Sequence, residues 1–177
     1  MKRLVLTLVG FLLATGCSSN SSTTSPSNTN GPGVSTVRFT ATLSPAQEAP
    51  SPITNAESTG SGSSTMDFTI TRDASSAITS ATVNFQVNMS GFPASTVVTI
   101  AHIHTGATGV AGPILISTTV TPGEVVLAGG AGTFTRVAVP VKTTDMDAIL
   151  ANPAGFYFNV HTSLNPAGVM RGQLVKQ

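Results

Sequence analysis

The sequence predicts an all-β domain, an antiparallel Greek-key sandwich or barrel with one short helix. Short runs of alternating apolar and polar residues recur at intervals of about 8–12 residues, which is typical of such folds. The chain has 17 glycines and 11 prolines among its 177 residues, and these supply the turns between the runs. Only 8 % of the chain is charged while 40 % is hydrophobic. This composition argues against a helical bundle, a polybasic nucleic-acid binder and an acidic disordered tail.

The first sixteen residues have the pattern of an export signal. Met1-Lys2-Arg3 is followed by an apolar run over 4–14, which is shorter than the roughly 20 residues that span a bilayer. Cys17 is the only cysteine, so no intrachain disulfide can form. The segment 14–17 (Ala-Thr-Gly-Cys) resembles a bacterial lipobox, which implies cleavage before Cys17 and its diacylation. The alternative is ordinary signal cleavage beside a free cysteine.

Residues 17–36 are therefore interpreted as a lipidated cysteine followed by a flexible linker of Ser, Thr, Asn, Pro and Gly. Loss of Lys2 and Arg3 with the signal leaves six basic and seven acidic side chains, a net charge of −1. That charge gives no electrostatic basis for a nucleic-acid partner. We expect an exported lipoprotein that is attached to a membrane, its partner, by its lipid anchor. Ser18, and not Asp, follows the cysteine, which by resemblance to Gram-negative sorting permits delivery to the outer membrane. In a Gram-negative cell we therefore expect the protein at the outer membrane or the periplasmic face.

The remaining residues, 37–177, predict one β domain. Strands are expected at 37–43, 65–70, 78–89, 97–104, 114–116, 133–141, 156–161 and 170–175. Gly60–Ser64 is predicted to be a flexible approach to a strand, and 106–113 and 123–132 to be glycine-rich loops. The short helix is expected over 145–151, capped by Thr143 or Thr144, with Asp145 and Asp147 in its first turn.

All three histidines lie in two predicted strands. His102 and His104 are two positions apart, so they share one face of their strand, and His161 is the remaining candidate for convergence with them. Imidazole suits copper, zinc, nickel and iron, and the absence of a thiol in the domain excludes cysteine-ligated sites. The three histidines thus form a candidate copper site, with zinc as the second choice. The alternative is that they are polar residues of a solvent-facing or hydrogen-bonded strand.

Other residues near these strands have candidate roles. Met170 is a candidate soft fourth ligand, although methionine more often fills a core. Asn159 shares the His161 face and could supply a hydrogen bond behind a ligand, while Tyr157 is expected to pack with a wet hydroxyl. Glu48, Arg171 and Gln173 are predicted to form a structural network in which a Glu–Arg pair pins the opening loop to the last strand. The alternative for that pair is a solvated contact.

Three motifs in order resemble the chordin-type (CHRD) domain. They are Leu-Ser-Pro-Ala-Gln-Glu-Ala-Pro at 43–50, Ala-His-Ile-His-Thr-Gly at 101–106, and Phe-Tyr-Phe-Asn-Val-His-Thr at 156–162, followed by Gly-Val-Met-Arg-Gly-Gln-Leu at 168–174. The resemblance covers about residues 37–175. CHRD domains occur as repeats in animal chordin, an extracellular antagonist of bone-morphogenetic-protein growth factors, and singly in bacterial exported proteins. The resemblance therefore implies an exported domain.

A His-x-His strand with a later strand histidine also resembles the copper site of Cu,Zn superoxide dismutase. The bridging histidine, the zinc ligands and the disulfide of that enzyme are absent from this sequence. Copper binding is therefore retained as an expectation, and dismutase activity is not.

Few features of the sequence favour an enzyme. There is no Gly-x-Ser-x-Gly elbow, the 106–113 loop lacks the Lys-Ser/Thr of a phosphate loop, and Asp145 and Asp147 belong to the helix start. Three hypotheses follow in descending order. The first is a copper-binding module, and the second is a non-catalytic module that binds another protein or a cell-surface polymer or is structural. The third is a copper enzyme.

Overall fold

The computed structural model describes residues 31–177, which fold into two antiparallel β-sheets. The predicted signal (1–16), the lipidation site Cys17 and most of the linker lie outside the described residues. Strand β1 begins at Gly33, inside the segment that the sequence analysis assigns to the linker.

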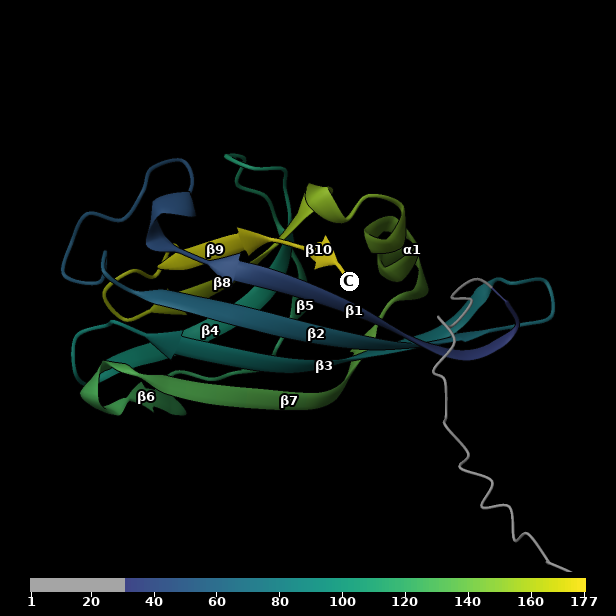
Figure 1. Cartoon of the computed structure of the whole chain (residues 1–177), viewed down its shortest axis with the longest axis horizontal. Coiled ribbons are helices and arrows are strands. Elements are labelled where there is room, and N and C mark those ends of the chain that lie inside the picture. The colour runs from purple at the N-terminus through teal and green to yellow at the C-terminus, as the bar shows by residue number, and fades with distance from the viewer. Residues whose placement is uncertain (1–30) are drawn as a thin grey trace, which may run out of the picture.

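The first sheet has the strand order β10-β1-β2-β3-β7, and the second has the order β5-β4-β8-β9 with β6 paired to β4. The strands of the first sheet are β1 Gly33–Leu43, β2 Ser61–Arg72, β3 Ile78–Ser90, β7 Gly132–Val141 and β10 Val175–Lys176. Those of the second are β4 Thr96–Thr105, β5 Ile114–Ser117, β6 Val125–Leu127, β8 Phe156–Thr162 and β9 Met170–Gln173. Figure 1 shows the first sheet in front of the second.

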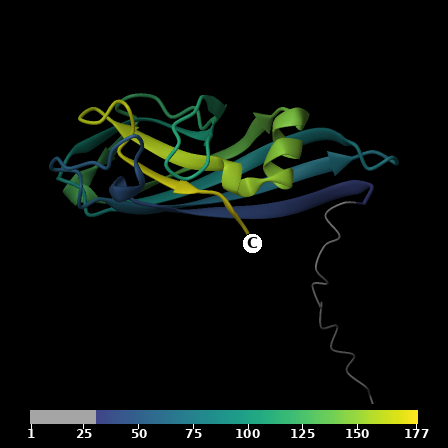
Figure 2. The ribbon, with the colours of Figure 1, turned by 90° about the horizontal axis from the view of Figure 1, so that it is seen from above.

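The two sheets form two layers when the molecule is seen from above (Figure 2), and the core lies between them. One α-helix, α1 Thr143–Ala151, buries Met146 and Ile149 and packs against β3. Single 3-10 turns occur at Pro45–Gln47, Ala128–Gly130 and Pro153–Gly155. The prediction of an all-β antiparallel sandwich with one short helix is confirmed.

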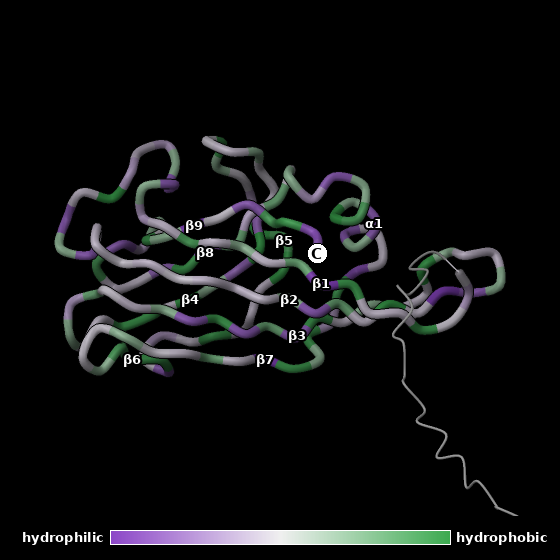
Figure 3. The backbone as a smooth tube through the Cα atoms, viewed as in Figure 1, coloured by the Kyte–Doolittle hydropathy of each residue, from purple (hydrophilic) through white to green (hydrophobic). Residues whose placement is uncertain are grey.

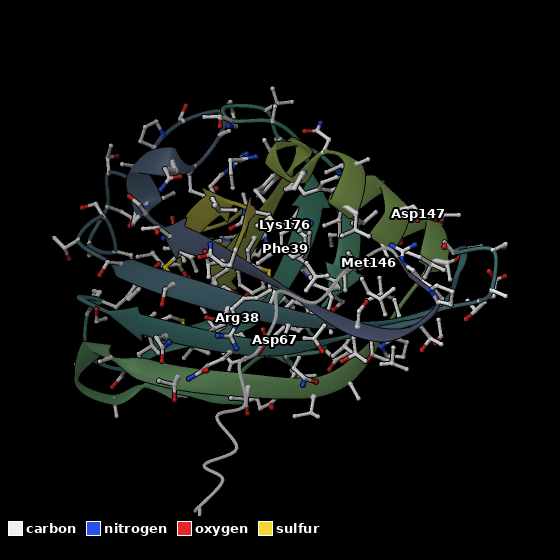
Figure 4. All side chains as sticks on the ribbon, turned by 45° about the vertical axis from the view of Figure 1, so that its right-hand side comes forward. Arg38, Phe39, Asp67, Met146, Asp147 and Lys176 are labelled. Atoms are coloured by element: carbon white, nitrogen blue, oxygen red, sulfur yellow. The ribbon has the colours of Figure 1, made fainter. Side chains whose placement is uncertain are left out.

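The first sheet has one dry face and one wet face. Its strands alternate buried and exposed residues, most regularly along β3, and the hydropathy colours of Figure 3 change along that strand in the same way. Phe39 and Phe68 meet edge to face in the core, with ring centroids 5.5 Å apart. Their neighbours Arg38 and Asp67 form an ion pair on the opposite, exposed face, where Figure 4 labels them. The period of two residues in the sequence thus decides which face of this sheet is buried.

The segment Gly60–Ser64 does not behave as predicted. Residues 61–64 belong to β2, and they pair with β1 on one side and β3 on the other. Gly62 fits there because a Cβ would lie 2.6 Å from the Asn88 carbonyl oxygen and 2.9 Å from the Met170 Cε. Pairing on both sides overrides the flexible local composition, and the glycine permits a close approach.

Three further boundaries differ from the predictions. Helix α1 is capped by Lys142, and neither Thr143 nor Thr144 occupies the cap. The predicted loop 123–132 contains the short strand β6. The last predicted strand is split at the buried Leu174, because β9 pairs with β8 in one sheet while β10 pairs with β1 in the other. The chain crosses between the layers at that residue.

Within residues 31–177, no helix is both long enough and apolar enough to cross a membrane.

Candidate metal centre

The three histidines lie on the outer face of the second sheet, on its two central strands. The inner-face residues Ala101, Ile103, Phe158 and Val160 belong to the core. Because side chains alternate, His102 and His104 of β4 and His161 of β8 all point away from it. In the β4–β8 pairing, Ile100 lies opposite His161 and His102 lies opposite Asn159. His161 is therefore one diagonal step from His102.

The pairing of β4 with β8 brings the three imidazoles together. The ring centroid of His102 lies 5.3 Å from that of His104 and 5.1 Å from that of His161, and the His104 and His161 centroids are 6.0 Å apart. One nitrogen from each ring lies within 4.8 Å of the other two. Three atoms so placed share a point within about 3 Å of each, whereas metal–imidazole bonds are about 2.0–2.1 Å long. Small ring rotations would close the remaining gap.

Two loops cover the site and orient two of the rings. His104 Nδ1 lies 2.9 Å from the Gly112 carbonyl oxygen, and His161 Nδ1 lies 3.0 Å from the Pro166 carbonyl oxygen. A carbonyl oxygen can only accept, so both Nδ1 atoms carry the hydrogen and both Nε2 atoms keep a lone pair. A metal-binding histidine is ordinarily held in this way, with its second nitrogen donating to a carbonyl or carboxylate.

Gly112 is required at the turn that supplies the first of these carbonyls. A Cβ at this position would lie 1.8 Å from the Thr105 carbonyl oxygen, so no other residue fits without moving the loop. The glycine thus sets the position of the hydrogen-bond acceptor of His104.

The site is buried and its imidazoles are neutral. His102, His104 and His161 are all less than 8 % exposed. Burial, and after it the neighbouring His161 and His104, lower the pKa of His102 to about 4. Burial also lowers the pKa of His104 and of His161, against the raising effect of their carbonyl partners. At neutral pH the rings therefore present lone pairs and not charges.

Three ring nitrogens remain without a hydrogen-bond partner although they are buried. They are His102 Nδ1, His104 Nε2 and His161 Nε2. A buried polar atom without a partner is destabilising by about 1–3 kcal/mol. Three such atoms from three converging rings fit a metal ion, which would accept all three lone pairs at once.

A stack of planar groups lies against His104. The Tyr157 ring is parallel to the His104 ring, with centroids 4.9 Å apart and an angle of 7° between the planes. The Arg171 guanidinium carbon lies 3.5 Å from the centroid of the Tyr157 ring. The Tyr157 hydroxyl is not free in water, because it accepts a hydrogen bond of 3.2 Å from the Gly112 N–H. Tyr157 thus joins Arg171, the 106–113 loop and the ligand His104.

Arg171 and Gln173 form the network predicted for them. Arg171 is 2 % exposed and donates to the carbonyls of Val110 and Ala107 and to the Gln173 side chain, all within 3.1 Å. Gln173 in turn reaches the carbonyls of Gly106, Ala154 and Phe156. The two side chains hold the 106–113 loop over the histidines. The alternative of a solvated arginine is wrong, because this guanidinium is buried.

Glu48 does not form the predicted ion pair with Arg171. Within the described chain the ion pairs are Arg38–Asp67 and Arg136–Glu124. Glu48 Oε2 instead accepts a long hydrogen bond of 3.5 Å from Asn159, and Oε1 has no partner. Burial raises the pKa of Glu48 to about 7, although the Arg171 charge and the Asn159 hydrogen bond oppose that rise. Arg171 uses its donors on loop carbonyls, which explains why the expected pair is absent.

Met170 is not near the candidate ligands. It pairs with Val160, whose side chain faces the core, and it is fully buried there. Its sulfur and Cε approach Gly62 of the other sheet. The candidate role as a fourth ligand is therefore wrong, because the methionine occupies the opposite face of the sheet from the histidines.

A second buried carboxylate, that of Glu57, is not predicted by the sequence. Glu57 is 3 % exposed, and its Oε2 accepts hydrogen bonds from Thr162 Oγ1 at 2.6 Å and Asn165 Nδ2 at 2.5 Å. These contacts tie the loop after β1 to the loop after β8, beside His161. No short-range pattern in the sequence connects residues more than one hundred positions apart, so only the fold brings them together.

No curated protein and no solved structure matches the chain. A family model described as the CHRD domain matches residues 39–174, which covers most of the chain and all of the strands that carry the histidine cluster. The resemblance of its three motifs is confirmed, and the chain belongs to the CHRD domain family.

Proposed function

We propose that this CHRD domain is a metal-binding module that holds copper through His102, His104 and His161. One observation carries the proposal: three buried imidazoles from two paired strands converge, and each has a ring nitrogen without a hydrogen-bond partner. The carbonyls behind His104 and His161 support it, because they bind Nδ1 and leave a lone pair on each buried, unpartnered Nε2 atom.

The donor set favours copper over zinc. An all-imidazole site binds either metal, but among divalent ions it binds copper more tightly than zinc, and copper, unlike zinc, can also be held as a monovalent ion. The role that fits a buried centre without an identified general base is storage, buffering or delivery of the ion.

The metal proposal is tested by isothermal titration of the purified protein with copper. One ion per chain is expected, and His102→Ala and His161→Ala should each lower the affinity on the order of 100-fold or more. Gln86→Ala is the matched control, because Gln86 is exposed on the outer face of the other sheet. A folded wild-type protein that takes up no copper at micromolar concentrations would show that the domain is a structural or protein-binding module instead.

We further propose that the domain is exported and anchored by a lipid on Cys17. The support is in the sequence: a basic start, a short apolar run and a lipobox-like segment before the only cysteine. Labelled fatty acid should be incorporated into the wild type and into Ser18→Ala, but not into Cys17→Ser. Release of the unlabelled wild-type protein into the soluble fraction would contradict the anchor.

A further inference from the structure

We propose that the site selects monovalent copper, Cu(I), over divalent ions, and that Arg171 enforces this choice through the Tyr157 ring. The inference rests on the proposed copper site and specifies which ion it accepts. It follows from the charges around the three rings.

The ligands themselves provide no negative charge. In the part of the chain that the structure describes, the cluster that could hold an ion consists of three histidines, without a carboxylate or a thiolate. The rings are almost completely buried. The desolvation penalty of an ion rises steeply with its charge, so a dry site made of neutral donors penalises a divalent ion far more than a monovalent one.

Arg171 adds a positive charge beside the site. Its guanidinium carbon lies 3.5 Å from the centroid of the Tyr157 ring, and the His104 ring is stacked with that same ring at a centroid distance of 4.9 Å. The hydrogen-bond acceptors of Arg171 are neutral, namely two backbone carbonyls and the Gln173 amide. No ion pair cancels its charge within residues 31–177.

The charge of Arg171 acts on a bound ion. The stack keeps the guanidinium within about 9 Å of the His104 ring, and at an effective dielectric constant near 20 a unit charge at that range changes binding by roughly tenfold per unit of ion charge. A divalent ion therefore loses about ten times more affinity to Arg171 than Cu(I) does. Arg171 is thus a positioning residue for the loop and for Tyr157, and its charge also discriminates between ions.

The negative charge of Glu48 opposes the positive charge of Arg171, so a Glu48 variant tests the same electrostatic effect independently. Its carboxylate contacts Asn159, which lies opposite both His102 and Arg171 in the strand pairings. Above pH 7 this carboxylate is ionised and offsets part of the arginine charge. Replacing it by the amide keeps its size and should raise the preference for Cu(I).

The test measures the ratio of Cu(I) to Cu(II) affinity of the full chain at pH 8. Each ion is competed against a chelator of known affinity, with Cu(I) handled without oxygen. Arg171→Met should lower the ratio about tenfold, and Arg171→Lys should restore it to within about threefold of the wild type. Glu48→Gln should raise the ratio. Arg38→Met is the control, since Arg38 is an exposed cation of the other sheet, and it should leave the ratio unchanged.

The outcomes separate the two proposals. If the folded wild type binds neither Cu(I) nor Cu(II), the copper site itself is wrong. If copper binds but the ratio is the same in the wild type, Arg171→Met and Glu48→Gln, the charge selection is overturned while the copper site stands. An Arg171→Met protein that does not fold leaves Glu48→Gln to decide, because that variant keeps all the Arg171 contacts.

Discussion

The outer faces of the two sheets are built on different principles. On the first sheet, buried and exposed side chains alternate along β3 from Val83 to Ser90, and the Arg38–Asp67 pair lies on the exposed face. On the second sheet, all seven residues of β8 are buried, including Tyr157, Asn159 and His161. Loops cover this face and bury a layer of polar side chains, some of whose atoms have no hydrogen-bond partner. Polar residues on a wet face need no partner in the protein, whereas those on the covered face do, and this requirement points to a ligand.

The largest loss of stability is expected from a substitution of Gly112, in the loop that covers the outer face of the second sheet. Gly112→Ala forces the loop away from the Thr105 carbonyl, so we expect a loss of about 3 kcal/mol or more in the free energy of unfolding, together with weakened copper binding. Gly109→Ala is the matched control in the same loop. Nothing lies near its Cβ, and its positive φ alone should be destabilising by about 1 kcal/mol. Chemical denaturation measures both, and equal losses would contradict the account of the covering loop.

Removal of the buried carboxylate of Glu57 should destabilise the domain more than removal of an exposed carboxylate. Glu57→Ala removes the acceptor of the Thr162 hydroxyl and leaves the Asn165 amide only its 3.4 Å contact to Asn55 Oδ1, so we expect a loss of about 2–3 kcal/mol in stability. The exposed Glu124, paired with Arg136, is the comparison. Glu124→Ala should barely move the denaturation midpoint. Equal midpoints for the two variants would show that the Glu57 network adds no stability.

Two buried titratable groups should give the stability of the metal-free domain opposite pH dependences that overlap between about pH 4.5 and 6.5. The pKa of His102 falls from 6.5 to about 4 on folding, so the unfolded chain binds more protons between those values and stability is lost as pH falls through them. The pKa of Glu48 rises from 4.5 to about 7, so its contribution is complete below 4.5 and is lost as pH rises through 7.

Denaturation at several pH values checks this profile. Each variant removes one of the two opposed contributions. In His102→Ala, stability should fall as pH rises from about 4.5 to 7, and in Glu48→Gln it should fall as pH drops from about 6.5 to 4. Asp67→Asn, on the wet face, should keep the wild-type profile over this range. A profile that neither of the first two variants changes would mean that these groups titrate alike in the folded and unfolded chain.

The smallest effect is expected on the wet face. Arg38→Met breaks an ion pair whose arginine is 57 % exposed, and such pairs contribute little because water screens them. The denaturation midpoint should stay close to that of the wild type, with any shift disappearing in high salt. A large destabilisation that persists in salt would remove the distinction between the two faces.

The sequence predicted best what depends on local periodicity. The strand expected at 78–89 is β3 Ile78–Ser90, and the shared face of His102 and His104 followed from their spacing. Convergence with His161 needed the pairing of β4 with β8, which spacing alone cannot provide. The sequence predicts a flexible segment at Gly60–Ser64 because glycine and serine dominate its composition. The pairing of residues 61–64 with β1 and β3 depends on distant strands, which local composition does not reveal. Glu48 was assigned to Arg171 because the loop carbonyls that satisfy this arginine have no sequence signature.

The most direct test of the central claim is X-ray absorption spectroscopy of the copper-loaded protein. The account predicts about three imidazole nitrogens at roughly 2.0 Å and no sulfur in the first coordination shell, since Met170 lies on the other face of the sheet. One of these nitrogens should be lost in His161→Ala. A shell with a sulfur scatterer, or one that is unchanged in His161→Ala, would contradict the convergence of the three histidines on one ion.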